Sequence, residues 1–251
     1  MKTAATRLGV LLLVLAGPGG PVSAMTPSSL SDCMAVGWRL KRITQAWSFS
    51  FMPVMAMPAQ CFAEFSISPT DVKIENGWRA EIEDPFRPME GEEAEYEFVT
   101  QIPASTLDVM PRGTLVTAQW HDNKRLGEKA QRPPLSHRLQ SDGTLIIALW
   151  NSAIHREQGD NGNGLTLFST MVPKDAWLMF RYQIRWSDNA MGRVKAWLND
   201  YQVIDYAGAI GYAGDPTGPY LKLGAYTVHP FGGPLMVRHA GYRRGAPSGV
   251  Q

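Results

Sequence analysis

Short segments in which polar and apolar residues alternate recur along this chain, and they constrain its fold more than any other feature. In Leu178–Trp186 every second residue is apolar, while Arg181, Gln183 and Arg185 lie between them. Because successive side chains of a β-strand point to opposite faces, this pattern predicts a strand with one face in a core and one in water. Similar segments are separated by turn-forming residues: Trp47–Phe51, Phe62–Ile67, Trp78–Glu83, Tyr96–Ile102, Leu115–His121, Leu145–Trp150, Met179–Trp186, Val194–Leu198, Val203–Tyr206, Tyr220–Tyr226 and Met236–His239.

Little of the sequence has the period of an amphipathic helix. Asp175–Met179 has room for one helical turn at most, because Pro173 precedes it and strand-like residues follow. Ser187–Gly192 and Asn199-Asp200 are polar turn sequences that predict hairpins. Many short strands joined by such turns predict an all-β fold, in which two antiparallel sheets pack as a jelly-roll sandwich.

The N-terminus has the features of a cleaved secretory signal peptide. Lys2 and Arg7 precede the apolar run Leu8–Ala16, and the small residues Val22-Ser23-Ala24 follow. The run is too short to span a bilayer, and no later stretch is long enough. We therefore predict a signal peptide at residues 1–24 and a single exported domain at residues 25–251, periplasmic or secreted and monomeric.

The charge balance argues against two classes of partner. Without Lys2 and Arg7 the basic residues number 22 (24 minus 2) against 23 acidic ones. Nucleic acids and membrane surfaces attract an excess of basic residues, so neither is expected as a partner. A local cationic groove is still compatible with an anionic polymer.

The two cysteines, Cys33 and Cys61, both lie in the exported part, where a disulfide persists. A Cys33–Cys61 bridge is the favoured prediction, and two buried free thiols are the alternative.

Two of the alternating segments carry unusual polar residues on one face. In Val116–His121, strand parity places Thr117, Gln119 and His121 together. The other face, directed to the core, carries Val116, Ala118 and Trp120.

A second segment, Tyr220–Tyr226, sorts in the same way, with Tyr220, Lys222 and Tyr226 on the polar side. A third, Trp78–Glu83, places Arg79, Glu81 and Glu83 on one face. Strands that bury one face and display amide, imidazole, phenol, guanidinium and ammonium groups on the other predict a binding site on a sheet.

This residue set suits β-elimination from a uronic acid within a polysaccharide. Removal of the carbon-5 proton leaves charge on the adjacent carboxylate, which donors such as Arg79, Gln119 and Lys222 stabilise. His121 and Tyr220 are the candidates for the base and the acid. In glucuronate the proton and the leaving oxygen lie on the same side of the ring, so one tyrosine can serve both. In iduronate they lie on opposite sides, and histidine as base with tyrosine as acid becomes natural.

Four elements, in this order, resemble the jelly-roll polysaccharide lyases that include glucuronan lyase and heparinase-type enzymes. They are Gln119-Trp120-His121, Pro133-Pro134-Leu135, Val194-Lys195-Ala196-Trp197-Leu198-Asn199 and Gly218–Tyr226. Alginate lyases of the same fold carry comparable Gln-x-His and Tyr-x-Lys-x-Gly elements. The resemblance runs from about Arg79 to Tyr226 and implies a concanavalin-like jelly roll that cleaves a glucuronan-like polymer.

The resemblance also implies residue roles: His121 and Tyr220 as the catalytic pair, Gln119 and Arg79 as carboxylate neutralisers, and Lys222 as a supporting cation. Glu81, Arg138 and Tyr226 are predicted to contact the substrate. The chain departs from the family pattern at Asp200, where glycine is usual, and at Leu221, where phenylalanine is usual. At His239 an acidic residue is expected, so no motif supports a structural calcium ion, and we expect no required cofactor.

Other functions are compatible with parts of the pattern. A glycoside hydrolase would use Glu81 and Glu83, but residues two apart on one strand cannot easily flank a bond from opposite sides. A carbohydrate-binding protein without turnover would keep the same groove. The glycine- and amide-rich segment Gln158–Gly164 is a mobile surface loop or a lid over the groove. His137, His155, His229 and His239 have no metal-binding spacing.

Overall fold

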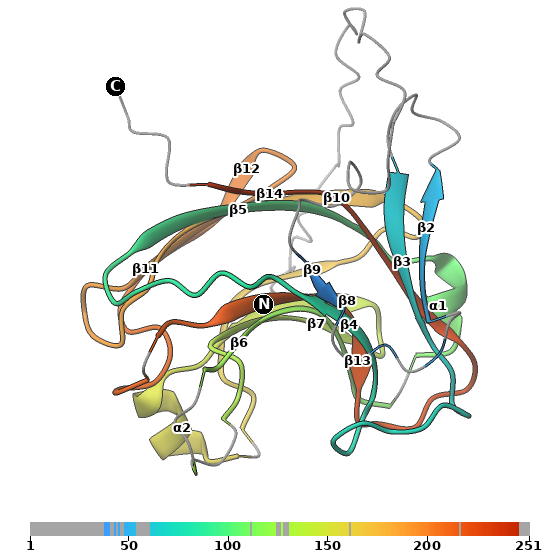
Figure 1. Cartoon of the computed structure of the whole chain (residues 1–251), viewed down its shortest axis with the longest axis horizontal. Helices are drawn as coiled ribbons and strands as arrows, with labels where there is room; N and C mark the ends of the chain where they lie inside the picture. The colour runs from blue at the N-terminus through green and yellow to red at the C-terminus, as the bar shows by residue number, and fades with distance from the viewer. Residues whose placement is uncertain are drawn as a thin grey trace, which may run out of the picture.

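The computed structural model describes two β-sheets packed face to face (Figure 1). The predicted signal peptide, residues 1–24, and Cys33 lie outside the described residues. The described residues are 38–40, 43, 45, 48–53, 61–110, 112–123, 127, 131–160, 162–215 and 217–245. Within them, no helix is long and apolar enough to cross a membrane.

Each sheet has seven strands among the described residues, and all strand pairs are antiparallel. The first sheet has the order β1 (Arg39–Leu40), β4 (Trp78–Glu83), β13 (Tyr220–Thr227), β6 (Thr114–His121), β7 (Leu135–Gln140), β8 (Thr144–Leu149) and β9 (Leu165–Met171). The second sheet has the order β12 (Tyr201–Ala207), β11 (Arg193–Leu198), β10 (Trp177–Arg185), β5 (Glu93–Gln101), β14 (Leu235–Gly245), β3 (Cys61–Ile67) and β2 (Phe49–Pro53). The described part of the chain also forms two short helices, α1 (Ala104–Asp108) and α2 (Ser152–Gln158). The predicted all-β sandwich is confirmed.

The core lies between the two sheets and consists of the apolar face of each alternating segment. On β10, Phe180, Tyr182 and Ile184 are buried as predicted, and on the first sheet Trp120 and Leu221 are buried opposite them. Full burial of one such side chain stabilises the fold by about 1.5–3 kcal/mol. The alternation that predicts the strands therefore also supplies most of the core.

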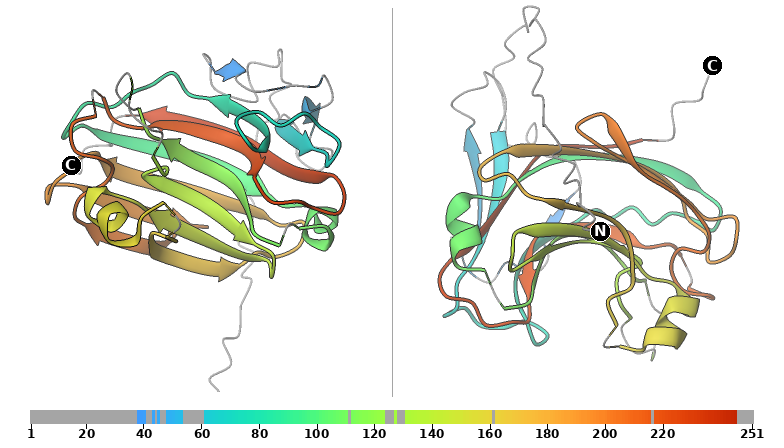
Figure 2. Two further views of the ribbon diagram at one scale, coloured as in Figure 1. Left: turned by 90° about the horizontal axis from the view of Figure 1, so that it is seen from below. Right: turned by 180° about the vertical axis from the view of Figure 1, so that it is seen from behind.

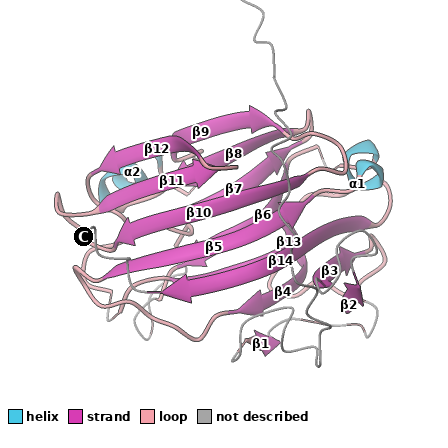
Figure 3. Ribbon diagram, turned by 90° about the horizontal axis from the view of Figure 1, so that it is seen from above, coloured by secondary structure: helices cyan, strands magenta, loops and turns pink. Residues whose placement is uncertain are grey.

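Both sheets arch in the same direction, so the first sheet has a concave outer face (Figure 1). Seen from below, β13, β6 and β7 lie side by side across this face, with α2 at one end (Figure 2). Seen from above, the strands of the second sheet run roughly along those of the first (Figure 3). Because Trp120 and Leu221 face the core, their neighbours Gln119, Tyr220 and Lys222 lie on the concave face.

A β-bulge in β6 overturns one detail of the predicted parity. Leu115 is in the core, yet Val116 lies opposite Tyr226 of β13 and Arg138 of β7, and the register shifts before Ala118. Relative to β7, Thr117 is the extra residue of this bulge, so the prediction that Val116 faces the core is wrong.

The turns and remaining elements show where local sequence is decisive. Asn199 and Asp200 both have positive φ angles, 48° and 68°, as a tight hairpin turn between β11 and β12 requires. Asp200 therefore occupies, without glycine, a conformation that glycine usually supplies. Strands β1, β7 and β9 and both helices are additions to the predicted elements. Asp175–Met179, which had room for one helical turn at most, contains the start of β10 at Trp177.

Cys61 begins β3 and is disulfide-bonded. The only other cysteine of the sequence is Cys33. Because Cys33 lies outside the described residues, the pairing stays a prediction.

Candidate active site

The register of β13 against β6 brings the predicted catalytic residues together. Tyr220 lies directly opposite His121, and Lys222 lies directly opposite Gln119. Opposite residues on antiparallel strands have Cβ atoms about 4.5–5.5 Å apart and share a face of the sheet. Four of the five predicted catalytic residues therefore adjoin one another on the concave face.

The other edge of β13 pairs with β4, which supplies the fifth residue. In this pairing Lys222, Gly224 and Tyr226 lie opposite Glu83, Glu81 and Arg79, respectively. The predicted convergence of three strands is therefore present in the structure, with β13 in the middle.

The rings of His121 and Tyr220 are in contact. Their centroids are 5.3 Å apart and their planes are inclined by 35°. Nδ1 of His121 lies 2.8 Å from the backbone carbonyl oxygen of Asp122, which only accepts, so Nδ1 donates. In the neutral imidazole the lone pair is then on Nε2, the nitrogen that a proton-abstracting role requires.

Two cations lie against Tyr220. The Cζ atom of Arg87 is 3.7 Å from the ring centroid, and the Nζ atom of Lys222 is 5.4 Å from it. Lys222 is only 1% exposed, so its charge acts in a medium that screens it weakly. Positive charge near a phenol stabilises its ionised form relative to the neutral one.

The predicted carboxylate neutralisers meet at Glu81. Nε2 of Gln119 donates to Oε1 of Glu81 at 2.5 Å, and Nη1 of Arg79 lies 3.7 Å from Oε2 of the same carboxylate. Arg79 also lies 3.7 Å from the Glu75 carboxylate and stacks on Tyr226, with Cζ 4.0 Å from the ring centroid. Gln119 and Arg79 thus both contact one protein carboxylate, and each carries more N–H groups than these contacts use.

Glycine is required where β13 passes Glu81. Gly224 has a φ of +150°, and a Cβ atom there would lie 2.1 Å from the carbonyl oxygen of Ala80. Gly77 leaves room in the same way for the ring of Tyr226, 2.4 Å from where its Cβ would be. The Tyr-x-Lys-x-Gly element of β13 therefore has a steric reason as well as a chemical one.

The polysaccharide lyase family profile matches residues 37–241, which is most of the chain. The chain belongs to the polysaccharide lyase family. No match was found among the curated proteins.

Solved structures of known lyases have the same fold. An endo-β-1,4-glucuronan lyase from the fungus Trichoderma reesei superposes with a TM-score of 0.67 at 18% identity, covering 86% of this chain and 93% of that one. The family 7 alginate lyase A1-II′ in complex with product gives 0.54 at 14% identity, covering 81% and 85%. The cellulose-induced protein Cip1 gives 0.54 at 10% identity, covering 83% and 90%. At these identities the likeness concerns the fold.

In this lyase, the two carboxylates that a glycoside hydrolase would need, those of Glu81 and Glu83, both bind other side chains. Glu81 binds Gln119 and Arg79, and Oε1 of Glu83 lies 2.7 Å from Nη2 of Arg87. Both carboxylates are buried on one strand. They are not placed on two sides of a sugar, which the paired carboxylates of glycoside hydrolases require.

Arg138 lies further along the concave face of the lyase, on β7. Its Nε donates to Oγ of Ser136 at 3.0 Å and its Nη1 to the carbonyl oxygen of Asn163 at 3.1 Å. Burial lowers the pKa of Arg138 to about 10, so it stays charged at neutral pH. The contact ties the Gln158–Gly164 loop to the sheet, and Arg132, in the segment before β7, donates to the carbonyl oxygen of Asp160 in the same loop.

Arg87 was not among the predicted site residues. It lies in the loop after β4, and strand parity says nothing about the direction of a loop side chain. The Asp84–Pro88 loop has a proline on each side of Phe86-Arg87, a sequence that signals a rigid turn.

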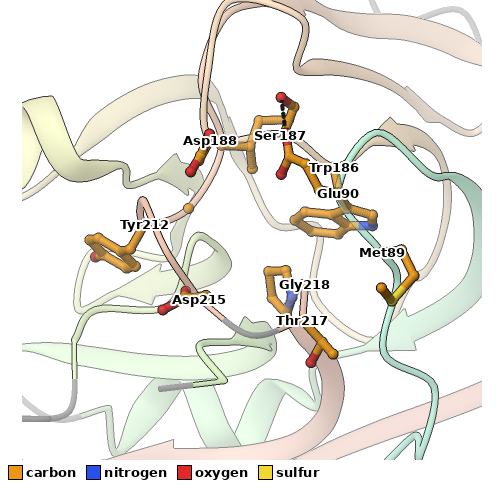
Figure 4. Close-up of a pocket in the computed structure, with 12 residues that line it drawn as sticks. Met89, Glu90, Trp186, Ser187, Asp188, Tyr212, Asp215, Thr217 and Gly218 are labelled. Carbon is orange, nitrogen blue, oxygen red and sulfur yellow. Dashed lines mark hydrogen bonds between the residues drawn. The ribbon is translucent and has the colours of Figure 1, made fainter. Parts of the chain in front are cut away.

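A small pocket of about 100 Å³ lies beside the predicted site (Figure 4). Gly218 and Pro219, which directly precede Tyr220, form part of its wall, but Tyr220 and His121 do not. Ser187 donates to Glu90 there at 2.5 Å, and Asp188 and Asp215 add negative charge. Its volume and its carboxylates fit water better than a uronic acid, since ligand pockets start near about 300 Å³.

The remaining histidines do not form a metal site. Among the described residues, no group of three or more His, Cys, Asp and Glu side chains is placed to hold a metal ion. His137 and His239 are buried in the core, where His137 contacts Tyr182 and His239 contacts Thr100. His239, the departure from the family pattern, is thus a core residue.

Proposed function

We propose that this polysaccharide lyase cleaves a uronic-acid polysaccharide by β-elimination and that its substrate is a glucuronan-like polymer. The observation that carries the proposal is the contact between His121 and Tyr220 on a concave face lined by Arg79, Gln119 and Lys222. This face provides a proton acceptor, a proton donor and carboxylate-binding groups within reach of one sugar.

The first requirement of the reaction is to make the carbon-5 proton acidic. In the proposed complex the sugar carboxylate accepts hydrogen bonds from Arg79 and Gln119, whose orientation Glu81 fixes. When carbon 5 loses its proton, charge develops on that carboxylate, and the donors that already face it stabilise the charge.

The second requirement is to move one proton. The ionised Tyr220 removes the carbon-5 proton, the carbon–hydrogen electron pair becomes the carbon 4–carbon 5 double bond, and the carbon 4–oxygen pair leaves with the glycosidic oxygen. That oxygen then receives the proton from Tyr220. If the sugar has the opposite configuration at carbon 5, His121 removes the proton and Tyr220 protonates the leaving oxygen.

Two observations support the first route and a glucuronan-like polymer. Arg87 and Lys222 beside Tyr220 favour its ionised form, which the single-tyrosine route requires. That route fits sugars whose carbon-5 proton and leaving oxygen lie on the same side, as in glucuronate. The structural neighbour from Trichoderma reesei is a glucuronan lyase, which makes glucuronan the first polymer to test.

The test is incubation of the purified chain, without residues 1–24, with glucuronan, alginate and heparin. A lyase forms an unsaturated end that absorbs ultraviolet light together with a new reducing end. A hydrolase forms reducing ends alone, and a binding protein forms neither while still retaining the polymer on a column. Glucuronan is expected to give the fastest increase in absorbance.

A chemically reduced polymer is the matched control. Conversion of the carboxylates to alcohols removes the group that Arg79 and Gln119 are proposed to hold, so cleavage should stop. Equal rates on the reduced and the native polymer would rule out β-elimination.

We also propose that the enzyme is exported, acts as a monomer and requires no metal ion. Export follows from the predicted signal peptide, and a fusion of residues 1–24 to a reporter tests it. Chelator treatment that leaves the rate unchanged would support metal independence, and light scattering in solution tests the oligomeric state.

A further inference from the structure

Among the described residues, two cations contact the ring of Tyr220, and Arg87 is the nearer of the two. Its Cζ atom is 3.7 Å from the ring centroid, against 5.4 Å for Nζ of Lys222. A guanidinium over an aromatic face is attracted by the ring, and more strongly when the ring carries the negative charge of a phenolate. The planar guanidinium offers the ring a face over which its positive charge is spread.

The guanidinium of Arg87 is fixed by three hydrogen-bond acceptors. Nη2 binds Oε1 of the buried Glu83 at 2.7 Å, and Nη1 binds the carbonyl oxygens of Asp84 at 2.7 Å and Phe86 at 3.0 Å. A planar group with this many contacts loses little further freedom when the substrate binds. The side chain is 22% exposed, so its charge is partly shielded from bulk water.

The loop that carries Arg87 is hydrogen-bonded on both sides of Tyr220, to Gly218 just before β13 and to Leu221 within it. The Asp84 amide donates to the carbonyl oxygen of Leu221 at 2.9 Å, and the Gly218 amide donates to that of Pro88 at 2.6 Å. A Cβ atom on Gly218 would lie 2.7 Å from Pro88, so the two segments are in close contact. The position of Arg87 over the ring is therefore set by the backbone and not by a flexible side chain alone.

We propose that Arg87 is a positioning residue for the elimination: it holds the ring of Tyr220 against His121 and favours the ionised phenol that accepts the carbon-5 proton. This inference rests on the proposed function. Arg87 touches Tyr220, not the reacting atoms, and Glu83 places it there.

The decisive variant is Arg87→Met, which keeps much of the side-chain length and removes the charge. We expect the acid limb of the plot of kcat against pH to move to higher pH by at least about one unit. At a fixed pH below the limb, this lowers kcat about tenfold. KM should stay within about twofold, and kcat should recover at high pH. Arg87→Lys, which keeps the charge and loses the planar contacts, should show a smaller displacement.

Glu83→Gln separates this role from that of a simple ion pair. If Arg87 served only to neutralise Glu83, both variants would lower the melting temperature and reduce kcat equally at all pH values, and the proposal would be overturned. The proposal requires the two variants to differ, since Glu83→Gln leaves the cation over Tyr220 and should displace the acid limb to lower pH or not at all. An increase in KM alone for Arg87→Met would also overturn it, because Arg87 would then be a substrate contact.

A measurement without turnover distinguishes failure of this inference from failure of the proposed function. Carbon-13 labelling of the tyrosine ring reports ionisation of each phenol by NMR, and the Tyr220 signal is the one missing in Tyr220→Phe. In Arg87→Met this signal should titrate at higher pH than in the parent protein, whether or not the polymer is cleaved. An unchanged titration would overturn the role of Arg87.

The second sheet offers a matched control. Arg181 stacks on Trp197 with Cζ 4.2 Å from the ring, a comparable cation–aromatic contact on the opposite side of the molecule. Arg181→Met should leave both the acid limb and the Tyr220 signal unchanged.

Discussion

The first sheet has a histidine–tyrosine contact on each of its two faces. On the concave face, His121 of β6 lies against Tyr220 with ring centroids 5.3 Å apart. On the core face, His137 of the neighbouring strand β7 forms a hydrogen bond of 2.5 Å with the hydroxyl of Tyr182 from the second sheet. The same two residue types thus meet in different environments only one strand apart.

Burial without charge keeps the core pair inert. Desolvation lowers the pKa of His137 to about 3 and raises the pKa of Tyr182 above its usual value. Neither ring therefore changes charge near neutral pH. The partly exposed pair has Arg87 and Lys222 beside it, which favour an ionised phenol. In the proposed mechanism, proton transfer therefore depends on neighbouring cations and on access to substrate, and not on the pairing of imidazole with phenol as such.

Removal of the exposed pair should have the largest effect on activity. His121→Ala and Tyr220→Phe are each expected to lower kcat by about 10²–10⁴-fold, the usual contribution of a general acid or base. Neither side chain is part of the core, so the melting temperature should change little. Wild-type rates in both variants would show that the reaction takes place elsewhere.

The core histidines should make stability depend on pH. Burial lowers the pKa of His137 to about 3 and of His239 to about 4, below the value of about 6.5 in the unfolded chain. The unfolded state therefore binds more protons below about pH 6.5, so stability is full above this pH and is lost as the pH falls toward 4. Each histidine contributes a loss of about 2 kcal/mol between about pH 7 and pH 5.

Denaturant titrations at a series of pH values measure this loss. In a double variant, His137→Gln with His239→Gln, the slope of stability against pH in this interval should largely disappear even if the protein is less stable overall. His155→Gln is the control, because His155 is at the surface beside Asp160 and is not in the core. An unchanged slope in the double variant would assign the acid sensitivity to other groups.

Tyr182→Phe should separate the two pairs. It leaves the buried His137 without its hydrogen-bond partner, at a cost of about 1–3 kcal/mol in the free energy of unfolding. Activity at temperatures well below the transition should stay close to that of the parent protein. A loss of activity as large as that of Tyr220→Phe, in a folded Tyr182→Phe protein, would mean that the core pair takes part in catalysis after all.

Strand alternation was sufficient to predict the sandwich and to place the concave-face residues on three strands. Gln119 and His121 on β6, and Tyr220 and Lys222 on β13, occupy that face because one core residue separates the two members of each pair. The neighbouring order of β4, β13 and β6 is not a consequence of parity, because alternation along one strand does not say which strand lies beside it.

The same reasoning failed where one residue breaks the pattern. His137 occupies a core position between Leu135 and Leu139, and a histidine there hides the alternation of β7. The extra residue Thr117 reverses the facing of Val116, and a bulge is visible only against its partner strands. Helix α2 had a local signal, since Asn151 caps its first turn and Gly159 ends it.

Arg138 tests how far the reactive face extends from the His121–Tyr220 pair, with the smallest expected effect. Arg138 is on β7, opposite Val116 of β6, and donates hydrogen bonds to Ser136 and Asn163. A positive charge there adds about 1 kcal/mol or less to the binding of an anionic chain, so Arg138→Met should raise KM by no more than about fivefold and leave kcat within about twofold. Arg193→Met, which breaks an exposed ion pair with Asp205 on the second sheet, should change neither constant. If Arg138→Met instead lowers kcat as much as His121→Ala does, the reacting sugar lies over β7, and the catalytic role now given to β6 and β13 has to be reassigned.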